Sequence, residues 1–248
     1  MPEKVNPIIS PLSQVWFIQN TTTEGPGYLG DLLKRWKIPM RICNLELGDP
    51  LPDVADQDAV IVLGGPMSAN DRTKTMLALL KWIRGLLRRD IPYLGICLGL
   101  QTLVKAAGGT VVKSPLKEVG LKMNDQFPYV CELTLDGKRD PLFRRFTKIF
   151  PVFQLHGEMV ELTPEMTLLA TGQWCHNQIA RVGKRAYGVQ GHLEVTTPVL
   201  TEWLQTDPDL KHYRPEFLIK EWLKEEKEMH YYCRKILLNF LKVARIVG

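Results

Sequence analysis

The sequence predicts a single doubly wound α/β domain with a mixed, largely parallel sheet and a long C-terminal helix. In the N-terminal half, short apolar runs rich in β-branched residues alternate with amphipathic helical stretches, which is typical of a parallel sheet. In the second half, short strands follow one another between Gly, Pro and Asp residues. No polar linker or internal repeat separates the halves, so we expect residues 1–248 to form one domain.

The first half supplies a regular series of predicted elements. Apolar runs predict strands, and periodic apolar positions predict helices, the last of them ended by a Gly-Gly pair. The predicted strands are 15–19, 59–63 and 93–96, and the predicted helices are 28–36, 73–89 and 99–107.

The second half is predicted to be rich in short strands before it ends in a long helix. The expected strands are 129–135, 148–154, 167–171, 178–182 and 186–190. Residues 215–243 then keep helical spacing of apolar side chains around a charged turn. That helix either packs on its own domain or binds a partner, and the pattern alone leaves both interpretations open.

Composition excludes several classes of protein. The chain is 45% hydrophobic and 24% charged, and its net charge of +5 includes no block of like charges, so we expect no nucleic-acid partner. The five cysteines are odd in number and form no C-x-x-C pair, which favours a reducing, cytoplasmic compartment over disulfides or a metal site. No leader-like apolar segment opens the chain and no stretch is apolar enough to span a membrane.

The pentapeptide Gly95-Ile96-Cys97-Leu98-Gly99 joins a predicted strand to a predicted helix. A sharp strand-to-helix turn needs small residues where the backbone crowds, and it would push the thiol out of the sheet. A helix N-terminus and a nearby imidazolium can make such a thiol a nucleophile. The alternative is a buried core cysteine, which leaves both glycines unexplained.

Two histidines could activate this thiol, since His156 and His192 each stand two residues before a glutamate and just after a predicted strand. Residues i and i+2 of an extended segment point to the same side, so either Glu158 or Glu194 could orient its histidine. The local pattern does not choose between them.

Two glycine-rich segments follow predicted strands. Gly64-Gly65-Pro66-Met67-Ser68 follows the strand 59–63, where backbone N–H groups could bind an oxyanion or the segment could be an ordinary turn. Residues 25–30 form a G-x-G-x-x-G pattern, but the segment 21–24 separates it from its strand. We therefore interpret that pattern as the start of the helix 28–36 rather than as a dinucleotide site.

The segments LGGPMS, YLGICLGLQ, FQLHGE and GVQGHLEVT, at 63–68, 93–101, 153–158 and 188–196, resemble class I glutamine amidotransferases. The likeness is to stand-alone members similar to the amidotransferase part of GMP synthase, a group that also resembles γ-glutamyl peptidases. It implies a flavodoxin-like fold, no cofactor and no metal.

The resemblance implies a Cys-His-Glu triad with Cys97 as nucleophile, His192 as base and Glu194 orienting it. By the same likeness, the N–H groups of Gly65 and Leu98 form the oxyanion hole. It also places Gly64, Gln101 and His156 at the glutamine-binding pocket. Three positions depart from the common family pattern, and they are Gly191, Leu193 and Leu155.

The function expected from this resemblance is hydrolysis of the glutamine side-chain amide through a thioester on Cys97, with ammonia passing to a separate acceptor chain. The sequence contains no SGGVDS-type ATP-pyrophosphatase signature. One alternative is a γ-glutamyl hydrolase acting on glutathione-like amides. Another is a non-catalytic binding subunit with the same fold.

Overall fold

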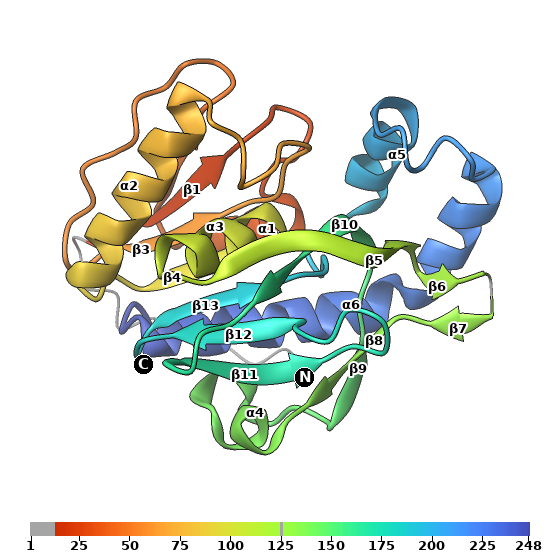
Figure 1. The fold of residues 1–248 in the computed structure, drawn as a ribbon. Helices are drawn as coiled ribbons and strands as arrows, with labels where there is room; N and C mark the ends of the chain where they lie inside the picture. The colour runs from red at the N-terminus through yellow and green to blue at the C-terminus, as the bar shows by residue number, and fades with distance from the viewer. Residues whose placement is uncertain (1–12, 125) are drawn as a thin grey trace.

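The fold is a nine-stranded mixed sheet with helices on both faces (Figure 1). It is seen in a computed structural model that describes residues 13–124 and 126–248. The sheet has the order β2-β1-β3-β4-β13-β12-β11-β8-β9, in which β2 to β13 run parallel and the following strands antiparallel. The predicted fold class, doubly wound and largely parallel with a long C-terminal helix, is confirmed.

The elements have the following bounds. The sheet strands are β1 (Val15–Gln19), β2 (Met40–Asn44), β3 (Ala59–Val62), β4 (Tyr93–Ile96), β8 (Val130–Leu133), β9 (Ile149–Pro151), β11 (Met166–Thr171), β12 (Ile179–Val182) and β13 (Ala186–Val189). Two further pairs are β5 (Thr110–Gly120) with β10 (Gln154–Glu161), and β6 (Lys122–Met123) with β7 (Phe127–Pro128). The helices are α1 (Gly27–Trp36), α2 (Lys74–Arg88), α3 (Leu98–Ala106), α4 (Leu135–Arg139), η1 (Pro141–Phe143), α5 (Thr197–Thr206) and α6 (Pro215–Val243).

The central strands divide their side chains between two hydrophobic cores, as the alternation of a pleated sheet requires. In β1, Phe17 joins the core formed with α1 and α6, whereas Ile18 joins the core formed with α2 and α3. In β3, Ile61 and Val62 are divided in the same way. Both faces of the parallel strands are therefore buried, which explains their nearly continuous apolar sequences.

The helix α6 keeps the bounds predicted for it and packs on its own domain. Its buried face includes Trp222, Ile236 and Phe240, none of which exposes more than 3% of its surface. The outer face retains exposed Phe217 and Leu223. One face of α6 therefore packs against the rest of the described chain.

Some predicted boundaries were wrong. The expected strand 148–154 is divided into β9, which ends at Pro151, and the start of β10 at Gln154. The strands β2 and β5 and the helix α5 were not predicted. Residues 1–12, where the sequence showed no leader-like segment, lie outside the described part of the chain. Among the helices that the structure describes, none is long and apolar enough to cross a membrane.

The register of the central strands brings distant segments to one edge of the sheet. Ile96, the last residue of β4, pairs with Val189, the last residue of β13, and β3 lies on the other side of β4. The residues that follow these three strands therefore meet at the same carboxyl edge, where ligands bind in folds of this class.

Candidate active site

Cys97 occupies a strained turn between β4 and α3. Its φ of 51° and ψ of −104° are unfavourable for a residue with a Cβ atom, and strain of this kind persists only where the surroundings impose it. The N–H of Cys97 donates to the carbonyl of Val189 at 2.8 Å, which ties the turn to β13. The residue is 7% exposed and lines a cavity of about 410 Å³, as the predicted turn requires.

The two glycines around Cys97 are explained by backbone contacts. A Cβ atom on Gly95 would lie 2.3 Å from the carbonyl oxygen of Gly99, and one on Gly99 would lie 2.1 Å from the carbonyl oxygen of Val62. Both distances are far below van der Waals contact, and neither neighbour can move freely because it is backbone. The crowding that the sequence predicted is therefore present on both sides of the thiol.

His192 and Glu194 follow β13 and form a buried pair. His192 Nδ1 and Glu194 Oε1 are 2.6 Å apart, so Nδ1 carries the proton that the carboxylate accepts. The thiol of Cys97 lines the same cavity and also acts on this imidazole. Burial alone would lower the pKa of His192, but the charge of Glu194 and the contact with Cys97 outweigh it and raise that pKa well above 6.5.

Trp203 of α5 packs against the ring of His192, a contact that was not predicted from the sequence. Their ring centroids are 5.0 Å apart at an interplanar angle of 73°. Trp203 Nε1 donates to the carbonyl of Thr23 at 3.2 Å, which links α5 to the loop after β1. The position of Trp203 could not be predicted because it depends on α5, which was not predicted either.

The proposed oxyanion donors lie beside one another. A Cβ atom on Gly65 would lie 3.1 Å from Leu98 Cδ2, so the loop after β3 contacts the start of α3. Among the described residues, neither the N–H of Gly65 nor that of Leu98 has a protein acceptor. Free N–H groups next to a nucleophile are the arrangement that an oxyanion hole requires.

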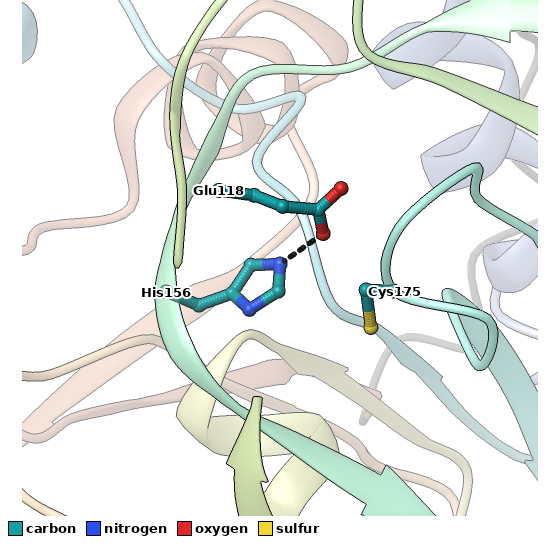
Figure 2. Close-up of side chains that lie close together, drawn as sticks. All are labelled: Glu118, His156 and Cys175. Atoms are coloured by element: carbon teal, nitrogen blue, oxygen red, sulfur yellow. Dashed lines mark ion pairs between the residues drawn. The ribbon is translucent and has the colours of Figure 1, made fainter. Parts of the chain in front are cut away.

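His156 lies inside β10 rather than just after a strand, and it belongs to a second histidine–glutamate pair (Figure 2). Its Nε2 is 2.8 Å from Oε2 of Glu118 on β5, and both side chains are 1% exposed. Its Nδ1 is 3.0 Å from the carbonyl oxygen of Glu158. The carboxylate of Glu158 instead accepts from Ser68 Oγ at 2.9 Å. The structure therefore gives the His-x-Glu geometry to His192 and not to His156.

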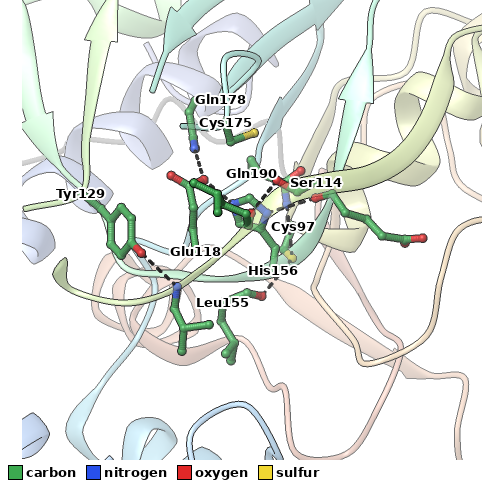
Figure 3. Close-up of polar contacts among 12 residues, drawn as sticks. Cys97, Ser114, Glu118, Tyr129, Leu155, His156, Cys175, Gln178 and Gln190 are labelled. Atoms are coloured by element: carbon green, nitrogen blue, oxygen red, sulfur yellow. Dashed lines mark hydrogen bonds and ion pairs between the residues drawn. The ribbon is translucent and has the colours of Figure 1, made fainter. Parts of the chain in front are cut away.

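A buried polar network connects this pair to the cavity wall (Figure 3). Gln178 Nε2 donates to Glu118 at 3.1 Å, and Gln101 Nε2 donates to the carbonyl of Glu158 at 3.3 Å. The register of β10 against β5 shifts at this point, between His156 and Glu158. The network thus fixes an irregular piece of strand that lines the cavity.

Two further contacts reach Cys97 from the same network. Gln190 Nε2 lies 3.6 Å from Cys97 Sγ, and the carbonyl oxygen of Leu155 lies 3.9 Å from it. Neither contact was predicted, although Leu155 was noted as a departure from the family pattern.

Glu118, His156 and Cys175 place three potential metal-ligand atoms within 4.8 Å of one another. The imidazole and the carboxylate contact each other directly, at a spacing typical of a hydrogen-bonded pair. The Glu118 carboxylate also accepts from Gln178 Nε2 at 3.1 Å, so protein partners already occupy it. The geometry favours a packed polar wall over a metal centre.

Glu24, in the loop between β1 and α1, lines the cavity next to the histidine that faces Cys97. Burial raises the pKa of this carboxyl to about 7, against the opposing effect of His192 and with added repulsion from Glu194 and Asp207. A Cβ atom on Gly64 would lie 2.1 Å from Glu24 Oε2 and 3.2 Å from His192 Cε1. Gly64 therefore leaves room for the carboxyl beside the imidazole.

The G-x-G-x-x-G pattern at 25–30 serves the packing of α1, which begins at Gly27. Gly27 has a φ of 49°, and a Cβ atom there would lie 2.3 Å from the carbonyl oxygen of Glu194. The N–H of Tyr28 donates to that same oxygen at 2.8 Å. The glycine thus lets the start of α1 support the chain at residue 194, as expected of a helix start.

Comparison with known protein families gives a match over most of the chain. The model for glutamine amidotransferase class-I matches residues 39–206. The glutamine amidotransferase-like protein YfeJ of Salmonella typhimurium is 33% identical over 164 residues, which cover 64% of this chain and 66% of that protein. A GMP synthase of Thermosipho africanus is 36% identical over 141 residues, covering 56% of this chain and 24% of that enzyme.

Solved structures give a more complete match. A glutamine amidotransferase of Thermotoga maritima has a TM-score of 0.81 and 26% identity, covering 94% of this chain and 98% of that one. The relation therefore extends over the described sheet and both helical layers. The GMP synthases, in contrast, are matched over about a quarter of their length.

Proposed function

Because the chain belongs to the class-I glutamine amidotransferase family, we propose that it hydrolyses the side-chain amide of glutamine and releases ammonia and glutamate. One observation carries the proposal. The buried His192–Glu194 pair, joined at 2.6 Å, faces a cysteine held on a strained turn at the wall of the same cavity. Nucleophile, base and orienting carboxylate are the parts that acyl transfer requires.

In the proposed reaction, His192 takes the proton of the Cys97 thiol and Sγ attacks the amide carbonyl. The N–H groups of Gly65 and Leu98 would bind the oxyanion of the tetrahedral intermediate. Its C–N bond then breaks, the imidazolium gives its proton to the departing nitrogen, and a γ-glutamyl thioester remains. Water, deprotonated by His192, attacks the thioester and releases glutamate and the thiol.

We place the release of ammonia next to a separate acceptor chain in the cytoplasm. The GMP synthases that the chain resembles are about four times as long as the matched region, and no SGGVDS segment occurs here. Glutamine is the substrate proposed for this chain, with no nucleic acid and no membrane as partner.

A γ-glutamyl hydrolase is the second candidate, because the cavity extends beyond the thiol to a charged rim. Lys113 and Lys117 of β5, and Asp209 after α5, line this rim, and Lys117 Nζ is 2.6 Å from Asp209 Oδ1. The cavity therefore has room for a γ-glutamyl amide larger than glutamine. The chemistry at Cys97 would be the same.

The test is to follow glutamate release from glutamine and from glutathione in the wild type and in Cys97→Ala. Release that depends on Cys97 supports the proposed chemistry, and the better substrate separates the two candidates. Equal background in both proteins, together with failure of a glutamine-analogue electrophile to label Cys97, would leave a non-catalytic binding subunit.

A further inference from the structure

We propose that Glu24 forms the leaving-group end of the cavity and selects γ-glutamyl amides whose departing amine carries no carboxylate. This inference rests on the proposed function, because it concerns the group that leaves when Cys97 attacks. It identifies a specificity-determining residue and the class of amine that this residue favours.

The backbone holds Glu24 in place. Its N–H donates to the carbonyl of Thr21 at 3.2 Å, and the carbonyl of the preceding residue, Thr23, accepts from Trp203 at 3.2 Å. Trp203 also contacts the ring of His192. The loop that carries Glu24 is therefore tied to the same side chain that holds the imidazole.

The carboxyl of Glu24 lies against Gly64, beside the Cε1 edge of His192, as the contacts of a Cβ atom on Gly64 show. It lines the cavity, yet no hydrogen bond or ion pair reaches it from the residues that the structure describes. A half-buried carboxyl that has no partner among the described residues and lies next to the proposed base has its hydrogen-bonding capacity available for a substrate.

The two ends of the cavity differ in their polar groups. Around Glu158 lie the side chains of Ser68 and Gln101, and Lys113 pairs with Glu158 in the β5–β10 register. This end presents the ammonium of Lys113 and the carboxylate of Glu158, which suit the α-carboxylate and the α-ammonium of a γ-glutamyl group.

Glu24 lies beside His192, and Asp207 lines the same cavity and acts on the charge of Glu24. The proton that releases the amine comes from His192 in the proposed reaction, so the leaving nitrogen faces this end. Apart from the imidazole, the charges that act on Glu24 there are the carboxylates of Glu194 and Asp207. A leaving amine with its own carboxylate would add another negative charge where burial weakens screening. Ammonia meets no such repulsion, and an amine with a second ammonium group gains an attractive contact.

The experiment compares three γ-glutamyl amides that share one head group and differ in the charge of the leaving amine. These are the methylamide, the 2-aminoethylamide and γ-glutamylglycine, in which the leaving amine is glycine with its free carboxylate. The last of these is called the glycine amide below. Glutamate release is followed at pH 8, above the pKa of about 7 that burial gives Glu24. We expect kcat/KM to fall from the aminoethylamide to the methylamide to the glycine amide, with about tenfold or more between first and last, as one well-placed charge contact of about 1.4 kcal/mol provides.

The variant Glu24→Gln keeps the shape of the side chain and removes its charge. The ratio of kcat/KM between the aminoethylamide and the glycine amide should therefore fall by about tenfold. Glu24→Asp keeps the charge and should preserve the order of the three amides by kcat/KM. The matched control is Glu202→Gln, since Glu202 is an exposed glutamate of α5 outside the cavity lining, and it should behave as the wild type. Thermal melting of each variant at pH 8 verifies that it is folded.

Three results would overturn the inference. One is a ratio of aminoethylamide to glycine-amide kcat/KM that is unchanged in folded Glu24→Gln. Another is a wild-type preference for the glycine amide. Absence of glutamate release from all three amides and from glutamine would instead show that the proposed function itself is wrong, and the inference would fall with it.

Discussion

The indole of Trp203 in α5 packs edge-on against the imidazole of His192, which follows β13 in the chain. This contact restricts the ring plane of the proposed base. It also makes the orientation of the base depend on the docking of a helix.

We expect Trp203→Phe to lower kcat for glutamine by about tenfold, because the smaller ring fills less of the space beside His192 and the bond to Thr23 is lost. Loss of one hydrogen bond and part of a buried ring corresponds to about 1 to 3 kcal/mol of stability. Steady-state kinetics and urea unfolding measure the two effects. Trp222→Phe is the control, because Trp222 is buried in the same core but contacts the ring of His230 and not that of His192. Equal losses of kcat in the two variants would contradict the role given to Trp203.

Cys97→Ala should abolish glutamate release, because loss of the nucleophile removes the covalent step. A glutamine-analogue electrophile should add one label to the wild type and none to this variant, as measured by intact mass. Burial raises the pKa of the Cys43 thiol to about 11, so Cys43→Ser should retain both labelling and turnover. Labelling that survives in Cys97→Ala would assign the reactive thiol to another residue.

The stability of the protein should depend on pH through Glu24. Burial raises its pKa from 4.5 to about 7, so the folded state binds this proton more tightly than the unfolded chain does. The resulting stabilisation is present below pH 4.5 and is lost as the pH rises through 7. Glu24→Gln lacks this dependence, so its free energy of unfolding relative to the wild type should rise by on the order of 1 to 3 kcal/mol between pH 5 and pH 8. Urea unfolding at both pH values measures this, and parallel curves for the two proteins would contradict it.

The pair of His156 and Glu118 should hold the cavity wall. Glu118→Ala leaves a buried imidazole and the amide of Gln178 without their partner, which costs about 3 to 5 kcal/mol when one member of a buried pair is removed. We expect a raised KM for glutamine with a smaller change in kcat, since the wall and not the nucleophile is disturbed. Glu118→Gln can still bond both neighbours and should restore most of the KM. If KM is unchanged in folded Glu118→Ala, the network does not shape the pocket.

Gly99→Ala should destabilise the turn, because its Cβ atom would meet the backbone of Val62 at 2.1 Å. Overpacking of this kind costs about 1 to 3 kcal/mol and would displace Cys97 as well. Gly85→Ala on α2 is the matched control, since its Cβ atom meets only a flexible arginine at 3.9 Å. In a helix that change should stabilise by about 0.5 to 1 kcal/mol. Melting temperatures that shift in the same direction for both would contradict this account.

Much of the fold could be predicted from local patterns. The strand β1 and the helix α6 have the predicted bounds, because one is a short apolar run and the other a long periodic stretch. The strand β5 was missed because Pro115 and charged residues interrupt its alternation, and it pairs outside the main sheet. The helix α5 was missed because Thr197, Thr201 and Thr206 have low helix propensity, which the burial of its apolar side overrides.

The candidate site was predictable where residues lie close together in the sequence. The turn at 95–99 and the His192–Glu194 pair are both short sequence patterns that imply a definite geometry. The partner of His156 was not predictable, because Glu118 reaches it across the β5–β10 pairing from 38 positions away. The position of Glu24 was not predictable either. It belongs to no motif, and its carboxyl lies beside His192 only because Gly64 has no side chain.

The hydrogen-bonded register of β4 with β13 has a consequence for how this protein can be controlled. Cys97 follows β4 and His192 follows β13, and the two strands are hydrogen-bonded neighbours in the sheet. The distance between the sulfur and the imidazole is therefore set by main-chain geometry and is difficult to change by substitution. Adaptation to a new amine, or to a docking enzyme, must therefore come from the segments laid over that edge, the stretch before α1 and the one after α5. We therefore expect evolution to keep the proposed reaction centre in place and to vary the loops that cover it.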